Sequence, residues 1–164
     1  MRGSSSGWFV VAVQGLVLLE SSPLDVCSSA WIAESMRTHA VFLRRVLALL
    51  VRANLVEARE GRNGGYRLAR PAAEITLADI YRAVQAASPF AQGLEEFERA
   101  CPLGSGLHVA LAGIVEETER ATLRVLAQHT VAEVARHLEV TGEAVAALSA
   151  PDERRRGLGS RTLR

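Results

Sequence analysis

The chain has 164 residues, of which 49% are hydrophobic and 5% aromatic. This length suits one domain, or one small domain with an appendage, and the hydrophobic content excludes wholesale disorder. The longest apolar run, residues 8–19, ends before Glu20 and is shorter than the roughly 18 residues that a membrane span needs. The amino end has no basic region followed by an apolar stretch and a cleavage site, so the sequence predicts a cytoplasmic protein with no membrane contact.

The net charge of +1 hides an uneven distribution of charge along the chain. Residues 1–72 carry nine Arg against five acidic residues, residues 73–150 carry five against eleven, and residues 151–164 carry five against two. All nineteen Lys and Arg residues are Arg, a bias that genome composition alone can produce. A basic amino-terminal half joined to an acidic remainder more specifically predicts a head that binds a polyanion.

Two helices are predicted at the amino end. Residues 8–19 are apolar on nearly all sides, which indicates a buried helix, and the serines before Pro23 end it. Either Ser28 or Ser29 can cap a short second helix over residues 30–36.

A third helix over residues 40–53 has the strongest amphipathic pattern in the chain. Thr38 is its expected cap, and Asn54 is expected to end it in a left-handed conformation. Its apolar positions recur at the spacing of one helix face, at Leu43, Val46, Leu47 and Leu50. Two helices about three residues apart, followed by a short strand, are typical of a helix-turn-helix.

A β-hairpin follows this third helix. Residues 55–60 and 66–69 are short extended runs on either side of a Gly- and Asn-rich turn, in which Gly61, Gly64 and Gly65 permit positive φ and close backbone approach. Thr76 and Asp79 resemble a capping box that starts a helix over residues 77–85. The sequence thus predicts a mainly α (α+β) fold, a winged helix-turn-helix head with a two-stranded wing.

The sequence predicts a division of the whole chain into four parts. Residues 1–85 form the winged head, residues 86–105 a connector rich in Pro and Gly, and residues 139–164 a flexible, Arg-rich tail. Residues 106–138 form helices with more apolar positions than one small head can cover, which predicts that they are dimerisation helices. The long helix covers residues 107–127, and Thr130 with Glu133 forms a second capping box that opens a short helix.

A helical wheel of residues 40–53 separates an apolar face from a basic one. At about 100° per residue, Arg45 and Arg52 lie opposite the apolar face and Arg44 flanks it, with small residues between them. Any amphipathic helix turns its Arg toward water, so this face alone is ambiguous. Combined with a wing and a basic head, it predicts insertion into a DNA major groove.

Four segments carry a resemblance to a known family: IAES (32–35), FLRRVLALLVRANLV (42–56), GRNGGYRLARP (61–71) and ITLADIYRAV (75–84). In this order and spacing they resemble the Rrf2 family of bacterial winged helix-turn-helix repressors, the IscR-, NsrR- and CymR-type regulators. The resemblance implies a homodimer that binds double-stranded DNA at a palindromic operator. Within that family, CPLG (101–104) before a long helix is similar to the subgroup without an iron–sulfur cluster.

The resemblance extends the set of candidate DNA-binding residues. Thr38, His39 and Val41 match the start of the family's recognition helix, and the second-helix serines suit a phosphate as well as a cap. The family often has Arg before the first wing glycine, where this chain has Glu60, so Arg59 or Arg62 takes over that role. The full candidate set is Ser28, Ser29, Thr38, His39, Val41, Arg44, Arg45, Arg52, Arg59, Arg62, Asn63 and Tyr66.

The two cysteines, Cys27 and Cys101, are not a disulfide framework, and they do not have the close spacing of metal ligands. Four-thiolate ligation within one chain is impossible, so no cofactor is expected, although His108 with nearby glutamates could form a mixed site. Cys101 precedes the long helix, whose amino end favours a thiolate, and is a candidate sensor of an oxidant or small-molecule inducer; the alternative is simple packing. Cys27 is expected to pack.

The sequence disfavours two other classes of function. The chain lacks a phosphate loop, H-E-x-x-H and a paired-cysteine redox motif, so the sequence predicts no enzyme. A winged head that contacts only proteins is the remaining alternative, and the Arg-bearing helix disfavours it. The sequence therefore predicts a DNA-binding transcriptional repressor.

Overall fold

The computed structural model describes residues 5–61, 64–84 and 104–140. The chain begins with three helices, α1 (Ser5–Ser21), α2 (Ser29–Ser35) and α3 (Ala40–Arg52). An antiparallel pair of strands follows, β1 (Val56–Arg59) and β2 (Gly65–Leu68), and then a 3-10 turn, η1 (Ala72–Glu74). The last described helices are α4 (Leu77–Val84), α6 (Gly104–Leu126) and α7 (Val131–Val140). The predicted winged, helix-rich fold is confirmed.

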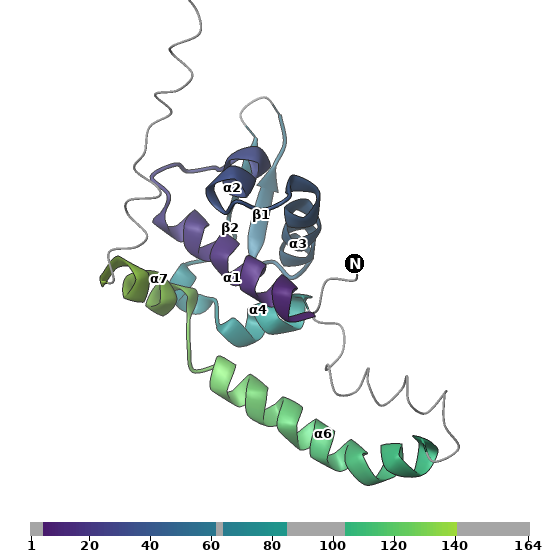
Figure 1. The fold of residues 1–164 in the computed structure, drawn as a ribbon. Helices are drawn as coiled ribbons and strands as arrows, with labels where there is room; N and C mark the ends of the chain where they lie inside the picture. Colours follow the sequence, from purple (N-terminus) through teal and green to yellow (C-terminus); the bar gives the residue numbers. More distant parts are fainter. Residues whose placement is uncertain (1–4, 62–63, 85–103, 141–164) are drawn as a thin grey trace, which may run out of the picture.

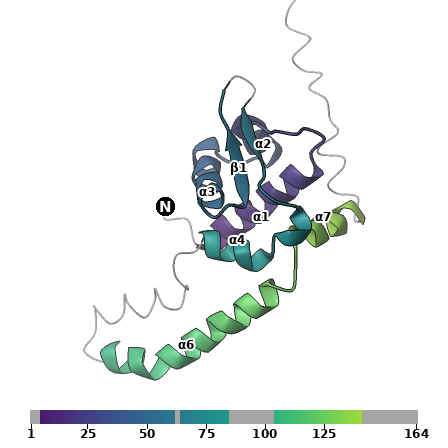
Figure 2. The same ribbon diagram turned by 180° about the vertical axis from the view of Figure 1, so that it is seen from behind.

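The head and the long helix are spatially distinct parts of the molecule. Figure 1 shows α1 crossing the middle of the head, with α2 and α3 above it, the wing rising beyond them and α4 below. The view from behind shows the same arrangement, with α6 extending away from the head beneath α4 (Figure 2). Among the described residues, no helix is long and apolar enough to cross a membrane.

The core of the head is built from small and aliphatic side chains, as the low aromatic content predicts. The predicted apolar face of α3 is fully buried: Leu43, Val46 and Leu50 have no exposed surface, and Leu47 has 1%. α1 supplies Leu16 from the other side, and α4 supplies Ile80. The predicted helix over residues 8–19 is only partly buried, because Val10 and Gln14 are exposed.

The turn between α2 and α3 differs from its prediction at one residue. Ser28 caps α2, since its Oγ accepts a hydrogen bond from the Trp31 N–H at 3.2 Å. Thr38 does not cap α3. It belongs to the turn after α2, in which its N–H donates to the Ala33 carbonyl at 3.0 Å, and the N-cap position falls one residue later, on His39. Asn54 ends α3 with φ of 55°, the predicted left-handed conformation.

The wing hairpin is anchored to the head through Cys27. β1 and β2 pair from Val56 opposite Leu68 to Arg59 opposite Gly65. On its other side β2 bonds the loop before α2, since the Cys27 N–H donates to the Tyr66 carbonyl at 2.9 Å and the Tyr66 N–H donates back at 2.8 Å. Cys27 is 1% exposed, so the packing role predicted for it is confirmed.

Two different backbone requirements explain why glycine occupies positions in the wing. Positive φ is found at Gly61, with φ of 105°, and close backbone approach at Gly64, where a Cβ would lie 2.2 Å from the Arg59 carbonyl oxygen. At Gly65 the reason is close approach, because a Cβ there would lie 2.4 Å from the Cys27 carbonyl oxygen. A side chain at that position would push the wing off its anchor.

The sequence predicted that the short helix opened by Thr130 belongs with the long dimerisation helix, but this helix, α7, packs in the head. α7 lies against α1 and η1, and it buries Val131 and Ala135 in the common core. Backbone bonds fix its start, since the Leu77 N–H donates to the His129 carbonyl and the Val131 N–H to the Ile75 carbonyl, both at 2.9 Å. The chain therefore returns to the head after α6.

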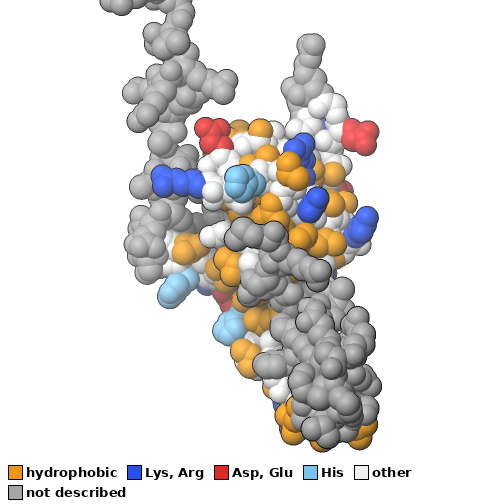
Figure 3. Space-filling view, turned by 45° about the vertical axis from the view of Figure 1, so that its right-hand side comes forward, with side chains coloured by type: hydrophobic (Ala, Val, Ile, Leu, Met, Phe, Trp, Pro, Cys, Tyr) orange, Lys and Arg blue, Asp and Glu red, His pale blue; other side chains and the backbone are white. Residues whose placement is uncertain are grey.

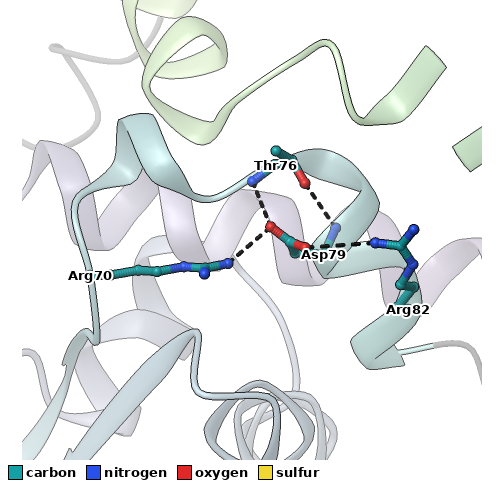
Figure 4. Close-up of polar contacts among 4 residues, drawn as sticks. All are labelled: Arg70, Thr76, Asp79 and Arg82. Atoms are coloured by element: carbon teal, nitrogen blue, oxygen red, sulfur yellow. Dashed lines mark hydrogen bonds and ion pairs between the residues drawn. The ribbon is translucent and has the colours of Figure 1, made fainter. Parts of the chain in front are cut away.

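Both predicted capping boxes are present, and they lie side by side at this junction. In the first, the Thr76 N–H donates to Asp79 Oδ2 and the Asp79 N–H donates to Thr76 Oγ1, each at 3.1 Å (Figure 4). Thr130 and Glu133 make the same pair of bonds at 3.1 and 3.3 Å. An isolated β-bridge joins Thr76 to Thr130, so the two helix starts support each other.

A tyrosine links the long helix to the head. The Tyr81 hydroxyl donates to Glu119 Oε2 at 3.1 Å, and its ring meets Phe9 edge-on with centroids 6.0 Å apart. Burial raises the pKa of Tyr81 above its ordinary value of 10.0, and the negative charge of Glu119 raises it further. The neutral phenol is thus the form that the folded protein favours.

Tyr81→Phe should lower the free energy of unfolding by about 1 kcal/mol at neutral pH, because it removes this hydrogen bond and keeps the ring. The raised pKa means that the bond contributes fully below about pH 10 and is lost as the pH rises through the folded-state pKa. Urea unfolding at pH 8 and pH 11 would measure both effects. Parent and variant with equal stability at pH 8 would contradict the link.

Candidate nucleic-acid interface

The exposed face of α3 is basic and carries no acidic residue. Arg44, Arg45 and Arg52 are exposed, as are Val41 and Ala48. Because the core side of α3 is fully buried, these side chains can only face outward. Figure 3, turned to bring the α3 side forward, shows basic and hydrophobic side chains interspersed on the upper part of the molecule. The structure therefore brings together the α3 residues that the sequence singled out.

The three arginines of α3 differ in how they are held. Arg44 Nε donates to the Ala40 carbonyl at 3.2 Å, which lays its side chain along the first turn of the helix. Within the described part of the chain, no ion pair to a carboxylate is found for Arg44, Arg45 or Arg52. Three unpaired guanidinium groups on one face suit an anionic partner such as the phosphates and guanine edges of DNA.

The residues at the helix starts are placed as follows. His39 is exposed at the N-cap position of α3, with no side-chain capping bond. Ser28 is exposed but its Oγ is engaged in capping, while Ser29 and Thr38 are half-buried. His39 is therefore the most accessible of these four candidates.

The wing candidates lie on both sides of a gap in the described residues. Arg59 is exposed at the end of β1. Tyr66 is half-buried and its ring packs against the core, so its described contacts are structural. Arg62 and Asn63, at the predicted wing tip, lie outside the described residues.

Arg67, on the outer side of β2, is occupied within the head. Its Nε donates to Glu57 Oε2 at 2.6 Å, and its Nη1 lies 3.9 Å from Asp25 Oδ1. The hydrogen bond to Glu57, followed by the charge of that carboxylate, holds the pKa of Arg67 above its usual value. This pairing explains why a basic residue of the wing is a weaker candidate than the α3 arginines.

One basic residue near the interface was not singled out from the sequence. Arg37 is exposed in the turn between α2 and α3 and adopts φ of 49°, a left-handed conformation that is uncommon outside glycine. Nothing in the residue type predicts this backbone. Arg37 adopts this conformation in the short turn that ends three residues before α3.

The described residues do not form a metal site. No group of three or more His, Cys, Asp or Glu side chains in residues 5–61, 64–84 and 104–140 could hold a metal ion. Cys27 is buried in the wing anchor, and Cys101 and the glutamates of the suggested mixed site lie outside the described residues. The chain has only these two cysteines, so it does not fit a cluster held by its own thiolates.

Comparison with known proteins finds matches along most of the chain. YwnA of Bacillus subtilis, a candidate HTH-type transcriptional regulator, is 34% identical over 128 residues, which are 78% of this chain and 94% of YwnA. Protein aau3 of Rhizobium meliloti is 44% identical over 82 residues, 49% of this chain, and the match spans only about half (53%) of aau3.

Solved structures share the fold. A candidate DNA-binding protein superposes with a TM-score of 0.60 at 30% identity, covering 77% of this chain and 97% of that one. CymR, the global cysteine regulator of B. subtilis, superposes with a TM-score of 0.56 at 18% identity, over 84% and 97% of the two chains. The Rrf2 family model, described as an iron-dependent transcriptional regulator, matches residues 6–137. The chain therefore belongs to the Rrf2 family, whose members are DNA-binding transcriptional regulators and not enzymes.

Proposed function

We propose that this protein is a repressor that binds a palindromic operator sequence-specifically as a homodimer. The observation that carries the proposal is the exposed face of α3. Arg45 and Arg52 lie opposite its fully buried side, Arg44 flanks them, and none of the three forms an ion pair within the described residues. The anchored wing follows closely in the sequence. A helix with this face fits a major groove, and the wing would reach the adjacent minor groove.

Selection from a pool of random duplexes tests this function directly. Repressor binding predicts enrichment of two inverted half-sites whose centres lie about 34 Å, one helical turn, apart. Binding of the selected duplex should also weaken steeply with salt. Failure to enrich any sequence would contradict specific binding and favour a winged module that contacts proteins.

The dimer is proposed to form through α6. Ile114 and Val125 are 60% and 57% exposed, far more than the apolar residues of the head core. Leu111, Ile114, Ala121 and Val125 recur with Thr118 at alternating three- and four-residue spacings. That spacing is the seam of paired helices, and a second copy of α6 would cover it.

Light scattering at micromolar concentration should give the mass of a dimer for the parent protein. Ile114→Glu should shift it to the monomer, because it places a charge in the apolar seam. Ala112→Glu adds the same charge on the opposite side of α6, where the residue is exposed, and should leave the dimer intact. A monomeric parent would remove the basis for palindromic recognition.

The signal is proposed to be chemical and not a bound cluster. With two cysteines in the chain, the purified protein should be colourless, and Cys101 is the proposed thiol sensor. Peroxide should lower operator affinity in the parent, while Cys101→Ser should bind the operator and ignore peroxide. Equal loss of affinity in both proteins would exclude Cys101, and a brown preparation absorbing near 400 nm would overturn the cluster-free assignment.

A further inference from the structure

Val41 is a large apolar side chain that lies exposed on the basic face of α3. Its exposed fraction is 59%, whereas the other large apolar side chains of α3 are buried or half-buried. It is also absent from the side chains that pack against the core. The fold gains little from Val here, since a β-branched residue forms helix less readily than Ala.

Val41 belongs to a line of outward-facing residues along the helix. Val41, Arg45, Ala48 and Arg52 follow one another at spacings of four, three and four residues and fall within about 60° of one another. Ala48 is small, so no bulky side chain projects from the helix between Arg45 and Arg52. A single exposed apolar residue is ordinary on a surface; its position between a helix start and two unpaired arginines is what distinguishes Val41.

The chemistry of the major groove matches this line. Arg binds the O6 and N7 atoms of guanine, and the apolar group that the groove presents is the 5-methyl of thymine. Residues in the first turns of a recognition helix are those that reach base edges. We infer that Val41 contacts the 5-methyl group of a thymine in each half-site, next to a guanine bound by Arg45. This inference rests on the proposed operator binding.

Substitution of single methyl groups in the DNA tests the contact. In the duplex that selection returns, each thymine is replaced in turn by 2′-deoxyuridine, in both half-sites, which removes only the methyl group and keeps base pairing. For the parent, affinity should fall about four-fold per half-site at one thymine position, the factor expected for burying one methyl-sized group. Val41→Ala should bind the thymine and deoxyuridine duplexes equally.

Val10→Ala is the matched control. It makes the same truncation at a valine that is 52% exposed on α1, and it should keep the parent's preference for thymine. A parent that is insensitive to every replacement, or a Val41→Ala variant that stays sensitive, would overturn the contact while leaving operator binding intact. If selection returns no preferred sequence, operator binding itself fails, and the thymine contact fails with it.

Discussion

Arg45→Ala should weaken binding to the selected operator by about 1–3 kcal/mol per half-site, a loss of roughly 5- to 150-fold. Arg45 lies in the middle of the outward face of α3 and has no partner among the described residues, so all its guanidinium donors are available. If Arg45 forms hydrogen bonds with a guanine, the Ala variant should also tolerate other bases at that guanine position in the operator. Titration of matched and base-substituted duplexes by fluorescence anisotropy would measure both losses.

Other arginines provide the comparison for this result. Arg44→Ala should cost less than Arg45→Ala, because Arg44 Nε is already bonded to the Ala40 carbonyl. Arg62→Ala should weaken binding evenly across sequences, as a wing contact to the DNA backbone would. Arg136→Ala removes an exposed arginine from α7, on another side of α1, and should have little effect. Parent-like binding by the Arg44, Arg45 and Arg62 variants would show that α3 does not enter the groove.

Asp79→Ala should lower the free energy of unfolding by about 2–3 kcal/mol, the largest stability loss expected of a single polar substitution in the head. Its carboxylate accepts the Thr76 N–H, bonds Arg70 Nη2 at 2.9 Å and lies 3.8 Å from Arg82 Nη1 (Figure 4). Truncation would remove one of the two bonds of the α4 capping box. It would also take the carboxylate from Arg70, whose buried Nε has no partner among the described residues. Urea unfolding followed by circular dichroism would measure the loss.

The second capping box is the natural control. Glu133 makes the equivalent bond to the Thr130 N–H, but its side chain is 45% exposed against 29% for Asp79, and no arginine is found bonded to it in the described residues. Glu133→Ala should therefore cost only about 0.5–1 kcal/mol. Equal losses for the two variants would mean that the Arg70 pair contributes nothing and that capping alone accounts for both.

Short-range signals predicted the local structure well. The two capping boxes, the Ser28 cap and the left-handed Asn54 are all confirmed, because each depends on bonds between residues at most four positions apart. The buried face of α3 was also predicted, since a helix fixes which side chains share a face. The Thr38 cap was wrong by one residue, because the turn that follows α2 includes Thr38 and the N-cap position falls on His39.

The sequence by itself determined the elements, the family and the basic face of α3. Periodicity and capping report the preferences of one segment, and they are silent about which distant segment will cover its apolar side. Only the tertiary structure decided that α7 returns to α1, that the Thr76–Thr130 bridge joins two helix starts, and that Cys27 anchors Tyr66 and the wing. Those contacts join residues tens of positions apart, which no pattern within one segment can report. Packing α7 against the head buries Val131 and Ala135 and removes their apolar surface from water.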